Sequence, residues 1–451
     1  MSHYKPYPAY RDSGVEWIGQ VPEHWEIKRL RHVASFTNSN VDKKSYDGQA
    51  AVSLCNYTDV YYNEFITADL PFMQATASSS EIEQFTLKKG DVIITKDSED
   101  PSDIGIPSLV AEDVPGVVCG YHLTMIRTAS ADTSRLLHRI LQSHPTQAHF
   151  FVGAPGITRY GLGQDTIGDV RVCLPPPQDQ GFIAACLDRE TARFDALIAK
   201  KTRFIELLKE KRQALITHAV TKGLDPNVAM KDSGVEWIGE VPEQWVIGRL
   251  CDFCSSISTG PFGTALGVSD YIEDGIPVIN PSHMNDGLCA PDRLVTVSEE
   301  TAQRLAFWVL REGDIVAARR GELGRAAIVT GEEAGWICGT GSLRLTPLPD
   351  RATPEYLYSV LQSGYARAWL DRESVGSTMP NLNESLIGRL PVVIPPSTTE
   401  QISLLGSLDQ QECRVSSLIA KTQRSIDLLK ERRSAFITAA VTGQIDLRES
   451  A

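Results

Sequence analysis

The sequence predicts an α+β protein in which two α/β-type domains are joined by two long antiparallel coiled-coil helices and related by a pseudo-twofold. Two repeats and one difference predict this. Asp12–Leu30 recurs as Asp232–Leu250 with 15 of 19 residues identical, and Leu197–Ile216 recurs as Leu418–Ile437 with 13 of 20 identical. The long stretches between these repeats differ almost throughout. The repeat is also far too long for a short-period solenoid.

These boundaries divide the 451 residues into six segments. They are a scaffold segment (1–30), a first variable domain (31–174), a central long helix (175–225), a second scaffold segment (226–250), a second variable domain (251–394), and a C-terminal long helix with a tail (395–451). Because the scaffold is repeated and the variable domains are not, we expect the two domains to perform related tasks differently.

Each scaffold segment carries two tryptophans, Trp17 and Trp25 in the first and Trp237 and Trp245 in the second. Their presence in both copies indicates a structural element, so we interpret all four as scaffold core. Base stacking is the alternative.

The variable domains mix short strands and helices. Residues 87–96 and 310–319 each resemble a turn followed by a β-rich strand, and further strands are expected near residues 114–128 and 334–347. Residues 136–143 and 356–363 are typical of short helices. The pattern therefore favours α/β or α+β domains with many loops.

The long helices are predicted by apolar residues at spacings of three, four and seven, which form one stripe on a helix. The stripe runs from Phe194 to Ile216 and is repeated from Val415 to Ile437, each helix following a proline-rich start. We expect helices over about 179–221 and 399–442. Neither stripe can be buried alone, so the two are expected to pair; packing of each helix on its own domain is the alternative.

Net charge is −13 and the pI is near 5.3, which is unusual for a protein that binds DNA. The basic residues are concentrated in the repeated helices: Leu197–Ile216 has six Lys and Arg against two Glu, and Leu418–Ile437 has five against two acidic residues. These cations fit a solvated helix face, contact with phosphates, or pairing with acidic helices of a partner.

Several function classes lack their motifs. The sequence has no phosphate-binding P-loop, no metal-binding histidine spacing, and no convincing nuclease carboxylate pattern. Residues 280–283 (NPSH) only approach an adenine-methyltransferase loop and are interpreted as a turn. Cys251 and Cys254 form a lone CxxC, interpreted as two buried free thiols. No apolar run spans a membrane or forms a signal peptide, so we expect a cytoplasmic protein with reduced cysteines.

Nearly end to end, the chain resembles the specificity subunit of Type I restriction-modification enzymes. The resemblance rests on the duplicated DSGVEWIG…VPE segment, the PP…Q helix starts, the LLKE helices followed by ITxAVT, and residues 313–329 and 375–396 of the second half. It implies that each variable domain is a target-recognition domain for one half of a bipartite, asymmetric DNA sequence. It also implies that the helices set the gap between the halves.

The same resemblance implies partners and no catalysis in this chain. Two adenine methyltransferase subunits would dock on the helices and scaffold segments, and a motor-nuclease restriction subunit would join them. AdoMet, ATP and Mg²⁺ would belong to these partners, with no cofactor, metal ligand or catalytic residue here. A self-contained methyltransferase or nuclease, and a scaffold protein that does not bind DNA, are the alternatives.

Arginine forks suit guanine edges and phosphates, and polar loops suit adenine edges. In the second domain the candidate DNA-binding residues are therefore Arg319, Arg320, Gly321, Arg325, Ser377, Thr378, Asn381 and Asn383. In the first domain the matching places hold Lys96, Asp97, Ser98, Thr158, Arg159, Tyr160 and Gln164. Surface pairing of Arg320 with Glu312 or Glu322, and capping by the polar loop, are the structural alternatives.

Overall fold

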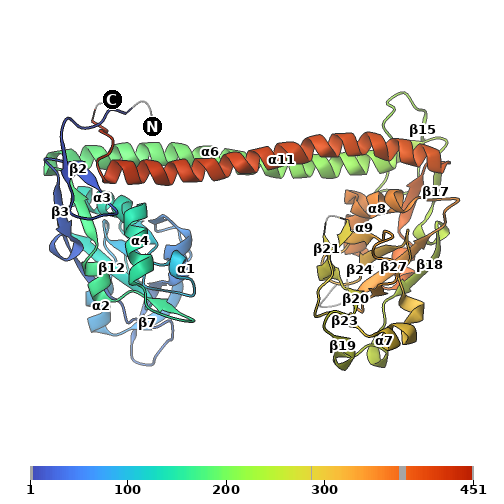
Figure 1. Ribbon diagram of the computed structural model, residues 1–451, viewed down its shortest axis with the longest axis horizontal. Coiled ribbons are helices and arrows are strands. Elements are labelled where there is room, and N and C mark those ends of the chain that lie inside the picture. Colours follow the sequence, from blue (N-terminus) through green and yellow to red (C-terminus); the bar gives the residue numbers. More distant parts are fainter. Residues whose placement is uncertain (1–3, 286, 375–381, 449–451) are drawn as a thin grey trace. The chain divides into compact units, whose positions relative to one another are not determined.

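The computed structural model describes residues 4–285, 287–374 and 382–448 (Figure 1). The chain forms two compact units, residues 1–202 with 424–451 and residues 203–423. Two long helices, α6 (Pro177–Lys222) and α11 (Thr398–Val441), each contribute one half to each unit. Both lie within two residues of the predicted bounds, so this prediction is confirmed.

Among its described residues, unit 1 has two sheets of three or more strands. The larger has the order β4 (Ala34–Asn38), β12 (Leu123–Thr128), β8 (Val92–Thr95), β10 (Pro107–Val110) and β6 (Phe65–Ile66). The smaller has the order β11 (Val117–Cys119), β5 (Ala50–Cys55) and β7 (Met73–Ala77). The helices are α1 (Tyr57–Tyr62), α2 (Ser79–Phe85), α3 (Ala131–Leu141), α4 (His144–Gly153) and α5 (Gln164–Gly168). The central strand β8 is buried along its whole length.

Unit 2 repeats this plan, with shorter strands in its second sheet. One sheet has the order β18 (Cys254–Thr259), β27 (Ser342–Pro347), β24 (Ile315–Ala318) and β25 (Ala326–Ile328). The other has the order β19 (Tyr271–Ile272), β23 (Thr296–Val297), β20 (Ile276–Ile279) and β26 (Ile337–Cys338). The helices include α7 (Glu299–Arg304), α8 (Pro354–Gln362), α9 (Gly364–Glu373) and α10 (Glu384–Gly388). In Figure 1, α8 and α9 lie between the long helices and the sheets of their unit.

The scaffold segments are small β structures that close each variable domain. Hairpins are formed by β1 (Tyr10–Asp12) with β2 (Gln20–Pro22), and by β15 (Met230–Asp232) with β16 (Glu240–Pro242). The next strand of each segment, β3 (Glu26–Arg29) or β17 (Val246–Arg249), pairs with the last strand of its variable domain, β14 (Arg171–Leu174) or β28 (Pro391–Ile394). The repeated sequence thus builds the frame at which each variable domain enters its long helix.

The four tryptophans divide into two classes. Trp25 and Trp245 are buried in the hydrophobic cores, as predicted. The prediction was wrong for Trp17 and Trp237, which are 55% and 40% exposed. Both lie in the turn between the two strands of a hairpin, where each ring is only partly covered; Arg372 lies 5.3 Å from the Trp237 ring centre.

Within each unit, opposite ends of the two long helices pack together, so the helices run antiparallel. In unit 1 the beginning of α6, with Ile183 and Leu187, shares a core with Phe436 and Ile437 near the end of α11. In unit 2 the end of α6, with Ile216 and Val220, shares a core with the beginning of α11. Each scaffold hairpin joins the same core, which explains why the stripe and the scaffold are duplicated together.

A buried glutamine fixes the beginning of each long helix to its variable domain. In unit 2, Gln401 Nε2 donates to the carbonyl of Arg351 (2.9 Å), and its Oε1 accepts from the peptide N–H of Thr353 (2.9 Å). In unit 1, Gln180 accepts from the hydroxyl of Thr133 (2.8 Å). These are the glutamines of the predicted proline-rich helix starts. No helix among the described residues is long and apolar enough to cross a membrane.

Candidate nucleic-acid interface

In unit 1 the candidate residues meet at the end of the buried strand β8. Lys96 follows this strand directly, and the short strand β9 (Asp97–Ser98) pairs with β13 (Tyr160–Gly161). This pairing brings two sequence-predicted groups together, because Arg159 immediately precedes β13. Thr158 is exposed in the same loop. Gln164 is exposed as well and begins helix α5, which follows β13.

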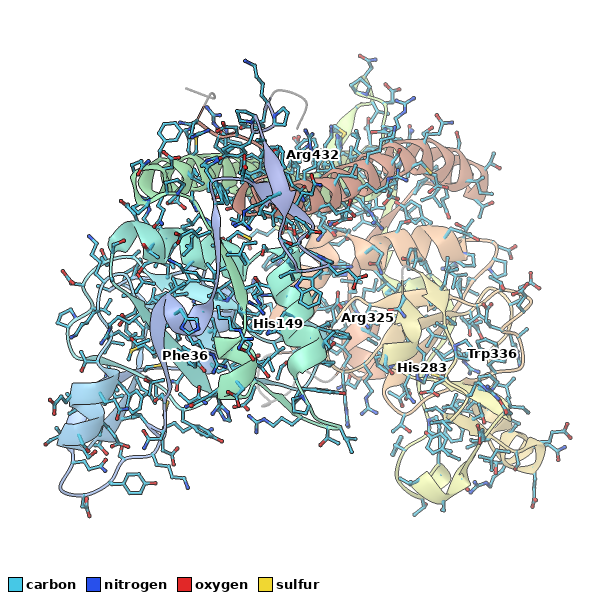
Figure 2. The ribbon with its side chains drawn as sticks, turned by 60° about the vertical axis from the view of Figure 1, so that its left-hand side comes forward. Phe36, His149, His283, Arg325, Trp336 and Arg432 are labelled. Atoms are coloured by element: carbon cyan, nitrogen blue, oxygen red, sulfur yellow. The ribbon has the colours of Figure 1, made fainter. Side chains whose placement is uncertain are left out.

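Helix α5 is tied back to helix α4 by a histidine. His149, on α4 (Figure 2), donates from Nε2 to the carbonyl of Thr166 at 2.8 Å. The contact is structural, since it satisfies a backbone acceptor between two neighbouring helices. It holds the segment that carries Gln164 against the rest of unit 1.

The second unit places Arg319 in the same backbone frame as Lys96. The peptide N–H of Lys96 donates to the carbonyl of His122 (2.8 Å), and that of Arg319 donates to the carbonyl of Gly341 (2.9 Å). The Lys96 carbonyl accepts from Leu162 N–H, and the Arg319 carbonyl from Leu382 N–H (2.8 and 2.9 Å). The two domains therefore present different side chains from one conserved arrangement of strands.

Arg319 and Arg320 have different surroundings. The Arg319 Nε donates to the carbonyl of Leu382 at 3.0 Å. Burial, and then the neighbouring Arg320 guanidinium, lower the pKa of Arg319. Arg320 is exposed. One arginine is thus partly held by the fold, while the next is open to a ligand.

The following turn depends on glycine backbone. Gly321 and Gly324 have φ values of +79° and +87°, which glycine adopts without the cost that a β-carbon adds. Arg325 ends the turn and pairs with Glu322 at 2.7 Å. It also donates to the carbonyl of Pro281 at 3.3 Å. Glu322 is therefore paired with Arg325, whereas the structural alternative in the sequence analysis paired it with Arg320.

Of the four candidate residues in the polar loop of the second domain, the structure describes only the last, Asn383. Ser377, Thr378 and Asn381 lie outside the described residues. Asn383 caps helix α10, since its side-chain oxygen accepts from the peptide N–H of Leu386 at 2.8 Å. The capping alternative therefore describes this side chain.

Two cysteines were expected to be buried thiols. Cys254 is buried, and burial raises its pKa to about 12. Cys251 is a free thiol but is exposed, so that part of the expectation was wrong. It lies on the short helix η3 (Leu250–Asp252), of which only Leu250 turns into the core. Among the described residues, no group of three or more His, Cys, Asp or Glu side chains is arranged to hold a metal ion.

Sequence reasoning missed His122 and Tyr121 in unit 1. Asp97 Oδ2 lies 2.7 Å from His122 Nδ1, and Arg159 Nη2 lies 3.1 Å from His122 Nδ1 and 3.2 Å from its Nε2. Lys96 Nζ lies 6.0 Å from the ring centre of Tyr121. Aligning the two domains on the shared Cys-Gly pair, CGYH at 119–122 and CGTG at 338–341, would have identified these residues.

A second missed feature is an ionic network in unit 1. The guanidinium of Arg139, of which 1% is exposed, pairs with Glu64 (2.5 Å) and Asp188 (2.8 Å). Arg433 of α11 pairs with Glu64 and, at 2.9 Å, with Asp195 of α6. Burial raises the pKa of Glu64, but Arg139 and Arg433 outweigh it and hold the pKa below its usual value. The network joins the variable domain to both long helices.

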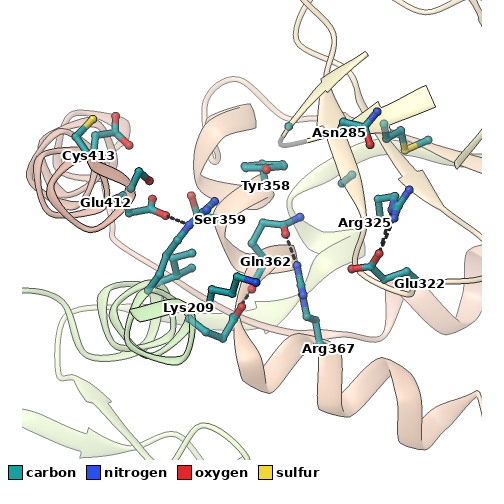
Figure 3. Close-up of a pocket in the computed structure, with 18 residues that line it drawn as sticks. Lys209, Asn285, Glu322, Arg325, Tyr358, Ser359, Gln362, Arg367, Glu412 and Cys413 are labelled. Atoms are coloured by element: carbon teal, nitrogen blue, oxygen red, sulfur yellow. Dashed lines mark hydrogen bonds and ion pairs between the residues drawn. The ribbon is translucent and has the colours of Figure 1, made fainter. Parts of the chain in front are cut away.

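Unit 2 has a cavity of about 700 Å³ at the corresponding place (Figure 3). By alignment, Ser359 replaces the long side chain of Arg139. Two of the arginines that line it have partners: Arg212 pairs with Glu412 (3.0 Å), and Arg367 donates to the amide oxygen of Gln362 (2.5 Å). Because these cations have partners and carboxylates also line the cavity, it has no clear preference for an anion.

Comparison with known proteins agrees with this geometry. A family model described as the Type I restriction modification DNA specificity domain matches residues 242–417. The chain is 25% identical over 293 residues to the Type I restriction enzyme EcoBI specificity subunit of Escherichia coli, covering 64% of this chain and 61% of that protein. It is 22% identical over 285 residues to the MjaVIII specificity subunit of Methanocaldococcus jannaschii, covering 62% and 63%. The chain thus spans a little under two thirds of the length of these relatives.

One solved structure resembles the fold over nearly the whole chain. It comes from work described as the structural basis of complex assembly and conformational transition of the type I R-M system. It superposes with a TM-score of 0.67 at 17% identity, covering 94% of this chain and 99% of that one. At this identity the likeness supports the fold.

Proposed function

We infer from the chain's similarity to Type I specificity subunits that it reads the DNA target of a restriction-modification complex. Each variable domain is a target-recognition domain for one half of a bipartite, asymmetric sequence in double-stranded DNA. Residues that follow β8 and β24 contact base edges in the major groove, where each base pair has its own pattern of donors and acceptors.

The observation that carries this proposal is the shared frame with different side chains. Lys96, Asp97 and His122 in unit 1 occupy the backbone positions of Arg319, Arg320 and Gly341 in unit 2. A structural role would favour the same residues in both copies, as Trp25 and Trp245 illustrate. Different donors and acceptors on one frame are what two different half-sites require.

The long helices set the gap between the half-sites and dock two adenine methyltransferase subunits. Each unit carries one exposed leucine from each helix: Leu197 and Leu428 in unit 1, Leu418 and Leu207 in unit 2. All four are between 45% and 58% exposed. They form two equivalent pairs, so a partner that binds one pair also fits the other, which supports two copies of one partner.

Catalysis belongs to the partners in this proposal. AdoMet is bound by the methyltransferase subunits, and ATP and Mg²⁺ by a motor-nuclease subunit. This chain contributes recognition and spacing.

Methylation mapping tests the proposal directly. Methylated adenines are compared in a host genome with and without this chain, and we expect a bipartite motif with a fixed gap only when the chain is present. Methylation by the purified chain with AdoMet alone would instead favour a self-contained enzyme. A complex with the partner that prefers no DNA sequence would favour a scaffold.

The exposed leucines test the stoichiometry. Replacing Leu197 and Leu428 by serine should reduce the complex from two methyltransferase copies to one, measured by light scattering. Val268→Ser is the control, since Val268 is an apolar side chain that is 90% exposed on the second variable domain. Two bound copies in the double variant would contradict this docking surface.

A further inference from the structure

His122 holds a backbone conformation that suits glycine. Its φ is +40°, in the left-handed region, which is strained for a residue with a β-carbon. The equivalent position in unit 2, defined by the bonds to Lys96 and Arg319, is Gly341, which does not share this positive φ. Unit 1 therefore keeps an imidazole where a glycine would be less strained. Strain of this kind is often found at functional sites.

Three segments that are distant in sequence meet at this imidazole. Asp97 lies on β9, Arg159 precedes β13, and Tyr121 is the neighbour of His122, with its ring centre 3.6 Å from the imidazole. The side chains of Asp97 and His122 are only 22% and 24% exposed, whereas Arg159 is exposed. Two partly buried groups thus support one exposed guanidinium.

The hydrogen bonds determine the roles of the two ring nitrogens. An ionised carboxylate only accepts, so we assign the proton of neutral His122 to Nδ1, which donates to Asp97 at 2.7 Å. Nε2 is then the unprotonated nitrogen. Arg159 Nη2 lies 3.1 Å from Nδ1 and 3.2 Å from Nε2, so the guanidinium packs against the imidazole near both ring nitrogens. These contacts use only Nη2 of the Arg159 guanidinium, which leaves its other N–H groups for a ligand.

We propose that Asp97 and His122 position Arg159 to contact a guanine in the half-site bound by the first domain. A guanidinium fork pairs with guanine O6 and N7, and this pair is the commonest base-specific contact in the major groove. Lys96 lies 4.0 Å from Asp97 and leaves the cluster with a net positive charge, which suits DNA. The proposal rests on the proposed function and names one of its contacts.

Glycine and asparagine at position 122 provide a matched pair of variants. His122→Gly copies the second domain, relieves the backbone strain and removes the imidazole. His122→Asn keeps a donor for Asp97 and an acceptor for Arg159, and asparagine tolerates the left-handed region. A purely structural role would be served at least as well by glycine, whereas a positioning role needs asparagine.

The test measures, for the full chain in complex with its methyltransferase, binding to duplexes that carry each of the four bases at each position of the first half-site. His122→Gly and Arg159→Lys should each reduce the preference for guanine at one position about tenfold, and together they should reduce it no further. His122→Asn should retain most of the preference. Asp274→Gly, which relieves similar strain at φ +57° in unit 2, should not change it.

Three results would overturn the proposal. The first is that His122→Gly retains the guanine preference, and the second is that His122→Asn loses it as completely as His122→Gly does. An equal loss of affinity for all sequences would identify Arg159 as a phosphate contact. Discrimination in the second half-site is the internal standard: if the unmodified chain discriminates in neither half-site, the proposed function itself fails.

Discussion

Thr217, near the end of α6, accepts a hydrogen bond from the peptide N–H of Gly364 at 2.8 Å, which ties the long helix to the first turn of α9. Unit 1 repeats this contact, because Thr438 of α11 accepts from the peptide N–H of His144 at 3.1 Å. Each variable domain is therefore attached to the end of one long helix as well as to the beginning of the other.

These attachments lead to a prediction about the gap in the DNA target. Four residues inserted after Thr202 and four after Gln423 would lengthen both helices at equivalent positions and leave the anchored ends intact. Each helix grows by about 6 Å and turns by roughly 40° beyond a full turn. Because DNA advances about 3.4 Å per base pair, we expect the gap to grow by one or two base pairs.

Methylation mapping of the insertion variant measures the gap. The half-sites should stay the same, because no candidate DNA-binding residue moves within its domain. A double Ala substitution at Thr202 and Gln423 is the control for the altered sequence. An unchanged gap in the insertion variant would show that the helices do not set it.

Arg319→Ala and Arg320→Ala should change recognition of the second half-site only. A bidentate arginine–base contact discriminates by about 1–3 kcal/mol. Arg320, which is exposed, should act mainly on DNA, whereas Arg319 also bonds to Leu382. Binding to variants of both half-sites measures this, and equal weakening of the two would identify general phosphate contacts.

Glu64→Ala should destabilise unit 1 by about 3 kcal/mol, because it leaves the buried Arg139 short of one counter-charge. Asp188 still faces Arg139, so unfolding of the unit is not expected at room temperature. Glu83→Ala, at an exposed position of α2, is the matched control. Denaturant unfolding measures both, and equal midpoints would show that the network contributes no net stability.

The buried imidazole of His138 should make the folding stability of unit 1 depend on pH. Burial, and then the Arg139 guanidinium, lower the pKa of His138 to about 3, whereas a histidine in an unfolded chain has a pKa near 6.5. The stability linked to His138 is therefore complete above about pH 6.5 and is lost as the pH falls toward 3. At pH 5 the loss is about 2 kcal/mol.

Thermal unfolding between pH 7 and pH 5 checks this sign. His138→Gln should flatten the pH dependence of unit 1, whereas His32→Gln, at an exposed position, should leave it unchanged. The same slope in His138→Gln as in the unmodified chain would contradict the assignment of a neutral buried imidazole.

The sequence alone determined the architecture. The duplicated stripe and proline-rich starts predicted α6 and α11 to within two residues, because helical periodicity and proline act locally. The repeat also located Lys96 and Arg319 at corresponding places, since a buried strand precedes both. These signals need no knowledge of what lies across the fold.

Only the tertiary structure decided which side chains meet. It showed that Trp17 and Trp237 are exposed rather than part of the core, because burial depends on which elements cover a turn. It joined Asp97, His122 and Arg159 through the pairing of β9 with β13, strands of two residues that carry no periodic signal. Contacts between segments far apart in the chain depend on register and packing across the whole domain. A local pattern therefore predicts the frame but not the cluster of side chains that the frame brings together.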